Sequence, residues 1–426
     1  MLDHTSRLLI VIALVSTYWF DPQTVVAQRT ASARFSVIHT FTGGKDGSYP
    51  YAGLAIDGNG NLYGTTNQGG SEKGSCPPAN DGCGNVFQMS RSKSGWTLRP
   101  LYLFLGGNDG QGPYGRVAIG ADGKLYGTTI EGGNQTCPSG CGTVFSLMPS
   151  TGCQSGSCAW SESVLYRFQG NSDGFYPTGD LALDSSGNVY GTTTQGGADG
   201  PGTIYELNSS KGKWSESILY SFTGQDDGAN PYSGVTLGAA GKMYSSTLTG
   251  GINNGGSAVE LTLSNGVWTE TTLHDFYPSN KGVFPQAGLV LEKSGKLIGA
   301  TAAGGPNNGG TVYELSPSNG DWRLSTLYNL TGSGEPGPWA KLTMDASGNL
   351  YGTTQGYPPV GDWGTVFKLA HTGGRWERTV LHRFTGGEDG GVPYSTVVFD
   401  SAGNLYGTTN LGGASKLGVV FEIAAQ

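Results

Sequence analysis

Tryptophan recurs in this chain at a fixed interval, and that interval limits what the chain can fold into. Six of the nine tryptophans form the series Trp96, Trp160, Trp214, Trp268, Trp322 and Trp376, whose last four intervals are 54 residues each. The same order of short segments surrounds each of them. Self-similarity at a constant period indicates a repeat protein, in which each unit buries its apolar face against its neighbours.

Each repeat contains short apolar segments that are typical of β-strands. Examples are residues 179–184, 190–193, 202–207 and 219–222, which are rich in β-branched and aromatic side chains. The turn from Asp184 to Asn188 places a glycine where a hairpin needs left-handed backbone. Glycine makes up 75 of 426 residues, and after residue 43 no glycine-free run exceeds 15 residues. This composition excludes a helical bundle.

Seven copies of a Tyr-Gly-Thr-Thr-like segment count the repeats. They start at Tyr63, Tyr126, Tyr190, Tyr244, Ile298, Tyr351 and Tyr406. Four strands per copy predict an all-β fold, a seven-bladed β-propeller of four-stranded antiparallel blades, with one domain over 35–426. The last copy ends after its third strand, while Phe35–Phe41 matches the fourth strand of other copies. We therefore predict that the N-terminal strand completes the last blade and closes the ring.

The first residues have the features of an export signal. Arg7 precedes an apolar stretch over 8–15, and Val25 and Ala27 occupy the small-residue positions before a cleavage site. We predict a signal peptide over 1–27, a linker over 28–34, and a secreted, periplasmic or cell-envelope location; an uncleaved membrane anchor is the alternative. The net charge of −8 and the lack of a basic run argue against a nucleic-acid partner.

The six cysteines lie in three close pairs. These are Cys76 with Cys83, Cys137 with Cys141, and Cys153 with Cys158. An even count in an exported chain favours disulfides, and pairing between near neighbours is the simplest connectivity. The spacing from 137 to 141 also suits zinc, but no histidine lies near it, and we assign no metal site.

The motif Leu-Tyr-Gly-Thr-Thr, followed by Gly-Gly and Gly-Thr-Val-Phe, is specific enough to suggest a family. On these segments the chain resembles the choice-of-anchor tandem repeat proteins of the GloVer type over residues 35–426. The resemblance implies an exported bacterial protein whose repeats form a propeller, and it implies little about activity. Many members carry a C-terminal sorting segment, whereas Gln426 here follows the last strand almost directly, so we expect release rather than anchoring.

One face of the propeller should carry the longer loops, where ligand-binding residues usually lie. These loops contain recurring aspartates and aromatic residues, namely Asp46, Asp109, Asp173, Asp227 and Asp389, and Tyr51, Tyr114, Tyr232, Trp339 and Tyr394. Carboxylates and aromatic rings suit a saccharide, and the carboxylates could instead suit Ca²⁺. The alternative is architectural: Asp-Gly forms turns, and the proline and aromatic residues wedge neighbouring blades.

Residues that depart from the repeat are further candidates for ligand binding, and the alternative is sequence drift in a tolerant loop. They are Trp339, Tyr357 and Trp363 of the sixth copy, and the charged Arg116, Asp180 and Lys341 at the start of inner strands. His39, His274 and His382 replace a tyrosine of the outermost strand, far from the axis, so we assign no catalytic residue.

Three functions fit these observations. The first is an exported, monomeric binding module for a polysaccharide or cell-surface glycan. The second is a glycan lyase or hydrolase that uses carboxylates, and the third is a structural envelope protein. No cofactor follows from the sequence.

Overall fold

The computed structural model describes residues 34–70, 76, 82–150, 159–277, 281–331 and 337–425. The predicted signal peptide, most of the predicted linker, and the pair Cys153 and Cys158 lie outside the described residues. Among the described residues, helical backbone is limited to three short 3₁₀ turns, η2 (Gly107–Asp109), η3 (Ala239–Gly241) and η4 (Pro358–Val360). None of it could span a bilayer.

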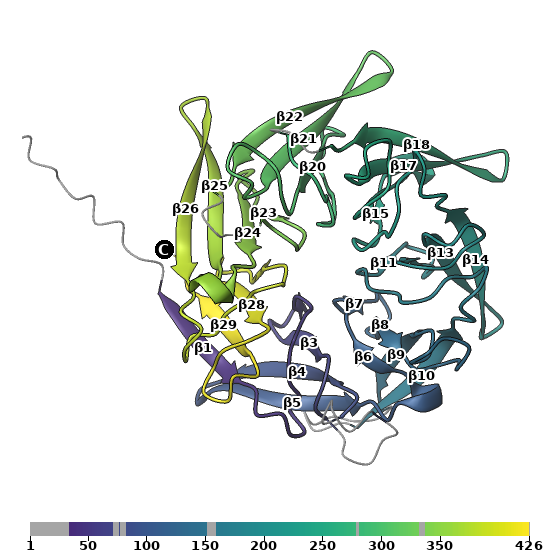
Figure 1. Ribbon diagram of the computed structural model, residues 1–426. Coiled ribbons are helices and arrows are strands. Elements are labelled where there is room, and N and C mark those ends of the chain that lie inside the picture. Colours follow the sequence, from purple (N-terminus) through teal and green to yellow (C-terminus); the bar gives the residue numbers. More distant parts are fainter. Residues whose placement is uncertain are drawn as a thin grey trace, which may run out of the picture. The chain divides into compact units, whose positions relative to one another are not determined.

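The strands form seven antiparallel sheets arranged as blades around a ring (Figure 1). Blade 1 contains β2 (Ala55–Ile56), β3 (Leu62–Thr66), β4 (Asn85–Ser92) and β5 (Gly95–Leu103); blade 2 contains β7 (Ala118–Ile119), β8 (Leu125–Glu131), β9 (Thr143–Pro149) and β10 (Trp160–Arg167), with β6 (Gln111–Pro113) paired to β8. Blade 3 contains β11 (Ala182–Leu183), β12 (Val189–Thr193), β13 (Thr203–Ser210) and β14 (Lys213–Ser221); blade 4 contains β15 (Thr236–Leu237), β16 (Met243–Ser246), β17 (Ser257–Ser264) and β18 (Val267–Asp275). Blade 5 contains β19 (Val290–Leu291), β20 (Leu297–Ala300), β21 (Thr311–Ser318) and β22 (Asp321–Asn329); blade 6 contains β23 (Thr343–Met344), β24 (Leu350–Thr354), β25 (Thr365–Thr372) and β26 (Arg375–Arg383). Blade 7 contains β27 (Val398–Phe399), β28 (Leu405–Thr409), β29 (Val419–Ile423) and β1 (Phe35–Thr40).

Blade 7 joins the two ends of the repeat array. Strand β1 pairs antiparallel with β29, in a register that runs from Phe35 opposite Ile423 to Thr40 opposite Val419. The chain continues into Phe41, which is fully buried and packs edge-on against Phe87 of blade 1 with ring centroids 5.4 Å apart. Both the predicted propeller and its predicted closure are therefore confirmed.

The hydrophobic core is divided into seven clusters, each at the junction of two neighbouring blades. At one junction Ile204 and Leu219 of blade 3 pack with Val235, Met243 and Val259 of blade 4. The outer strand of every blade has a one-residue bulge, at Ile38, Leu101, Leu165, Leu219, Leu273, Leu327 or Leu381. Each bulged side chain belongs to a junction cluster or packs against one. A single blade therefore buries its apolar faces only with its neighbours.

The glycine of the Tyr-Gly-Thr-Thr strand is explained by the residue opposite it. In six blades this glycine pairs with an aromatic residue of the third strand, as Gly407 does with Phe421. A Cβ at position 407 would lie 2.5 Å from the Phe421 ring, so only glycine fits beneath it. Blade 4 supports this explanation, because there Ser245 faces the smaller Val259.

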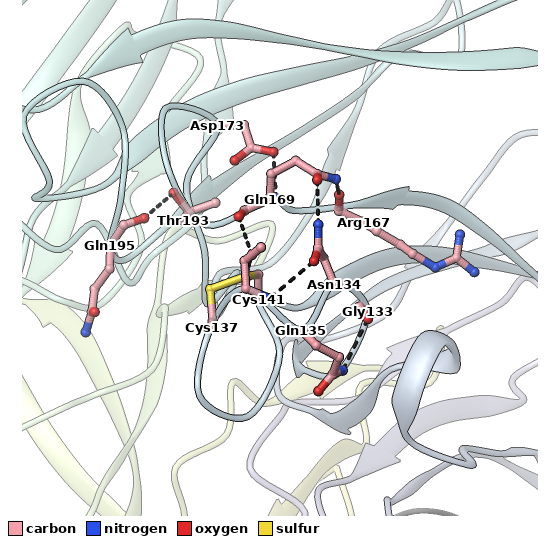
Figure 2. Close-up of a disulfide and its surroundings, with 11 residues drawn as sticks. Gly133, Asn134, Gln135, Cys137, Cys141, Arg167, Gln169, Asp173, Thr193 and Gln195 are labelled. Atoms are coloured by element: carbon pink, nitrogen blue, oxygen red, sulfur yellow. Dashed lines mark hydrogen bonds between the residues drawn. A yellow bond between two sulfur atoms is a disulfide. The ribbon is translucent and has the colours of Figure 1, made fainter.

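Two of the three predicted disulfides fall within the described residues, and both form as predicted: Cys76–Cys83 and Cys137–Cys141. Figure 2 shows the second one beside the loop that enters blade 3. A Cβ at Gly170 of that loop would lie 2.5 Å from the Cys137 sulfur, and the Tyr176 amide donates to the Cys141 carbonyl at 3.1 Å. The disulfide therefore fixes a blade junction, and its sulfurs are not free to bind zinc.

The pairing of glycine with an aromatic ring predicts a specific coupling between two substitutions. Gly407→Ser should destabilise the protein by about 1–3 kcal/mol through overpacking, and Phe421→Val by about 2 kcal/mol or more through a cavity. The double variant, which copies the blade 4 pair, should lose at least about 1 kcal/mol less than the sum, as measured by denaturant unfolding. Additive losses would contradict this explanation of the motif.

Candidate functional site

The chain enters each blade through a tripeptide with proline at its centre, and this tripeptide builds the rim of an axial cavity. In blade 7 it is Val392-Pro393-Tyr394. The Val392 backbone is left-handed at φ 56°, and its amide donates to the carbonyl of Trp363 in the preceding blade at 2.8 Å. Pro393 packs against Gly364, where an added Cβ would lie 2.7 Å from the proline ring. These contacts fix the residue that follows the proline.

The seven residues that follow these prolines line one cavity of about 540 Å³, to which every blade contributes. In blade order they are Tyr51, Tyr114, Thr178, Tyr232, Gln286, Trp339 and Tyr394. We call this set the rim. The rim is asymmetric, because its aromatic members are not evenly distributed.

Four aromatic rings from consecutive blades form a continuous arc. Tyr51 stacks on Tyr114 with centroids 5.0 Å apart and planes 20° apart, and it lies 5.4 Å from Tyr394. Trp339 meets Tyr394 edge-on at 5.5 Å. The Gln355 amide donates to the Tyr394 hydroxyl at 2.6 Å, which fixes that ring. We call these four residues, Trp339, Tyr394, Tyr51 and Tyr114, the aromatic arc.

The rest of the rim is more polar. Thr178 and Gln286 lie on either side of Tyr232 in the blade order, and both are more than nine-tenths buried. The Thr178 hydroxyl and the Gln286 side-chain nitrogen have no hydrogen-bond partner among the described residues. A buried polar group without a hydrogen-bond partner costs free energy in a folded protein. A ligand that hydrogen-bonds such a group removes this cost.

Charged groups lie at the base of the cavity, each two residues after the rim residue of its blade. Arg116 of blade 2 contacts the Asp180 carboxylate of blade 3 through its guanidinium at 3.2 Å and its amide at 3.0 Å. Lys341 of blade 6 donates from its ammonium to the Thr236 hydroxyl of blade 4 at 2.9 Å. Asp180 and Lys341 line the cavity. The three charged residues that depart from the repeat therefore lie at one place.

The surroundings shift the pKa of several of these groups. Burial, with a further contribution from the charge of Arg116, lowers the pKa of Lys341 to about 8, while Asp180 acts in the opposite direction. Burial raises the pKa of the tyrosines Tyr51, Tyr114, Tyr232 and Tyr394 above the usual range, so they stay protonated at neutral pH.

The five recurring aspartates do not line the axial cavity. Each carboxylate accepts from the amide four residues before it and hydrogen-bonds the outer-strand side chain seven residues before it, as Asp227 does with Thr223 at 2.7 Å and Tyr220 at 2.9 Å. The others, Asp46, Asp109, Asp173 and Asp389, make the same contacts. These contacts are those expected if the aspartates hold the turns of the loops. Among the described residues, no group of three or more His, Cys, Asp or Glu side chains is placed to hold a metal ion such as Ca²⁺.

Two aromatic candidates of the sixth copy also lie away from the cavity. Tyr357 is half-exposed beside η4, and Trp363 is partly buried against Gly386, where an added Cβ would lie 2.2 Å from its ring. Of that copy, Trp339 and Lys341 reach the cavity, while residues 332–336 lie outside the described residues. The histidines occupy outer strands as expected, with His39 and His382 hydrogen-bonded to Asp46 and Asp389.

Thr178 and Gln286 were not predicted from the sequence as site residues. The signal that could have found them is the proline at the end of each entry loop, because the residue after it occupies the rim in all seven copies. Thr236 was also missed, since its role depends on Lys341 reaching across from blade 6.

Comparison with known proteins identifies the repeat. The model of the Gloeobacter/Verrucomicrobia repeat matches residues 21–185 and 323–426, more than half of the chain. The chain belongs to the Gloeobacter/Verrucomicrobia repeat family. A search of curated proteins found no match.

One solved structure supports the architecture and no more, and a second is similar over much of its length. PorZ, a surface component of the type-IX secretion system of Porphyromonas gingivalis, matches with a TM-score of 0.51 at 13% identity, over 89% of this chain and 46% of PorZ. A candidate 6-phosphogluconolactonase from Bacteroides uniformis matches with a TM-score of 0.49 at 15% identity, over 78% of this chain and 84% of that protein. Identities this low show the fold alone.

The loop aspartates have a consequence for stability, because half-buried glutamates of the next outer strand lie near them. Burial raises the pKa of Glu216 to about 7, and the charge of Asp173 adds to this effect. Glu216 Oε1 and Asp173 Oδ1 are buried without a hydrogen-bond partner among the described residues. Glu162 beside Asp109 and Glu270 beside Asp227 repeat the arrangement, with pKa values also raised to about 7.

We predict that these three glutamates make stability fall as the pH rises from about 5 to 8. A carboxyl whose pKa is higher in the folded state than in the unfolded state binds its proton more tightly when folded, and that stabilisation is lost as the pH passes the folded value. Glu216→Gln should therefore raise the free energy of unfolding by about 1 kcal/mol at pH 8, after allowance for partial exposure, and have little effect at pH 5. Glu377→Gln, at an exposed position of β26, is the control. An equal gain at both pH values would contradict the assignment.

Proposed function

We propose that this protein is an exported binding module that takes a saccharide in its axial cavity. The observation that carries the proposal is the aromatic arc, four rings from four consecutive blades that line one side of the cavity, with a few polar and charged groups elsewhere in its wall. A pyranose ring has apolar C–H faces that stack on aromatic side chains and hydroxyls that need hydrogen-bond partners. The cavity offers both kinds of surface.

The size and construction of the cavity support this function. Its volume of about 540 Å³ is within the range of small-molecule sites, which are largely apolar with a few placed polar groups. Thr178 and Gln286 supply buried polar atoms without protein partners, and such atoms are available to ligand hydroxyls. Rim residues fixed by proline and by hydrogen bonds between blades give a pre-organised site, which lowers the cost of binding.

The other functions have less support. Glycoside hydrolysis in most families needs two carboxyl groups on either side of the scissile bond. Among the described lining residues, Asp180 alone carries a carboxylate, and it is paired with Arg116. A purely structural role gives no reason for an aromatic arc that lines a cavity. Export is supported by the predicted signal peptide and by two disulfides, which suggest an oxidising environment.

A glycan array tests this proposal with the mature chain and three variants. Tyr51→Ala and Trp339→Ala should each weaken binding of the captured saccharide by at least about tenfold, because each removes a stacking surface worth about 1.4 kcal/mol. Tyr357→Ala is the matched control, since it removes an exposed aromatic residue of blade 6 outside the cavity. Titration calorimetry gives the affinities, and thermal unfolding confirms that each variant is folded.

Two outcomes would overturn the saccharide proposal. One is an array on which the wild-type protein binds no saccharide. The other is binding that Tyr357→Ala weakens as much as Tyr51→Ala and Trp339→Ala do.

A further inference from the structure

The residues two positions after each rim residue lie at the base of the axial cavity, and all of them except Arg116 and Gly234 line it. In blade order they are Gly53, Arg116, Asp180, Gly234, Gly288, Lys341 and Thr396. Three are glycines, and the one in blade 5 leaves room for a long side chain from another blade. Lys341 uses this room: a Cβ at Gly288 of blade 5 would lie 3.2 Å from the Lys341 Cδ. The side chain therefore passes blade 5 to reach blade 4.

Lys341 is held in place with most of its hydrogen-bonding capacity unused. Its ammonium donates to the Thr236 hydroxyl at 2.9 Å, and that hydroxyl donates to the Leu289 carbonyl at 2.6 Å. Thr236 is the one hydrogen-bond partner of Lys341 among the described residues. A lysine ammonium has three donors, so two remain available in the cavity.

The charges at the base of the cavity do not balance. Arg116 and Lys341 are positive and Asp180 is negative, and Asp180 is paired with Arg116 through two contacts. The described lining residues of the cavity add no other charged side chain. One positive charge is therefore left over in a partly buried place, where an unpaired charge is unfavourable. An anion would remove this cost and use the two free donors of Lys341.

The position of this charge relative to the aromatic arc indicates what kind of ligand carries the anion. Lys341 lies two residues beyond Trp339, the end of the arc on blade 6, and both side chains line the same cavity. A ligand with a ring against the arc and an acidic substituent toward the base would contact both at once.

We propose that the ligand is an acidic saccharide, and that Lys341 selects it by binding its anionic substituent, a carboxylate or a sulfate ester. This inference rests on the proposed saccharide binding and adds the specificity of the site. Arg116 is a positioning residue that holds Asp180 through its guanidinium and its amide.

The test uses matched pairs of oligosaccharides on the full mature chain. Each uronate-containing oligosaccharide is paired with its methyl ester, and each sulfated one with its desulfated form, so that the members differ only in the anion. For the best-bound backbone, the acidic member should bind at least about tenfold more tightly than its neutral partner. The stronger of the two acidic series distinguishes a carboxylate from a sulfate.

Variants of Lys341 assign the preference to this side chain. Lys341→Met keeps the length without the charge, and it should bring the affinity for the acidic member down to that of the neutral member measured with the same variant. Lys341→Arg keeps a charge and should retain part of the preference. Thermal unfolding of both variants shows whether they fold, and neutral binding reports an intact cavity.

The pH dependence provides a second reading of the same group. Arg116 and Asp180 are the charged groups near Lys341, and the rim tyrosines have raised pKa values. As the pH rises from 6.5 to 9, Lys341 loses its proton, because its pKa is about 8. The acidic member should then lose most of its advantage in the wild-type protein, and Lys341→Met should show no such change.

The outcomes separate this inference from the saccharide proposal. If neutral and acidic members bind equally, or if the preference survives in Lys341→Met, the acidic specificity is wrong while saccharide binding stands. If no member of any pair binds, both proposals are wrong.

Discussion

Burial of apolar surface between neighbouring blades is the interaction on which the rest of the structure depends. A four-stranded blade of this chain has no core of its own, because its aromatic and aliphatic side chains pack in clusters that always include the next blade. Such an arrangement is complete only when the last blade meets the first. Pairing of β1 with β29 meets this requirement, because it gives the last blade its fourth strand from the start of the repeat array.

The same constraint explains why glycine is so frequent. Blades come close enough at their junctions that backbone meets side chain, as at Gly364 beneath Pro393, and strands within a blade come close enough that Gly407 lies under Phe421. These contacts recur in most copies, so glycine recurs with them. A high glycine content often indicates a flexible chain, but in this protein it results from close packing.

The sequence predicted the fold well because the strand pattern recurs: one copy of the pattern is weak evidence, but seven copies at a regular spacing are strong evidence.

The candidate site was harder to predict from the sequence. Asp227 was a candidate because carboxylates bind ligands, but aspartate next to glycine also holds turns, and a sequence does not show which role applies. Trp363 departs from the repeat because it fills space over Gly386. Arg116, Asp180 and Lys341 were identified individually, while their proximity follows from the ring.

Closure of the ring also determines the site. The aromatic arc runs over blades 6, 7, 1 and 2, so Tyr394 comes from the end of the chain and Tyr51 from its beginning, and their rings lie 5.4 Å apart across the closing junction. The residues beside them come from the same two ends, since Thr408 donates to the Ala52 carbonyl at 2.9 Å. A ligand that contacts Tyr51 and Tyr394 together therefore binds only the closed ring. By linkage, such a ligand stabilises the closed ring against opening, so that binding and the pairing of β1 with β29 depend on each other.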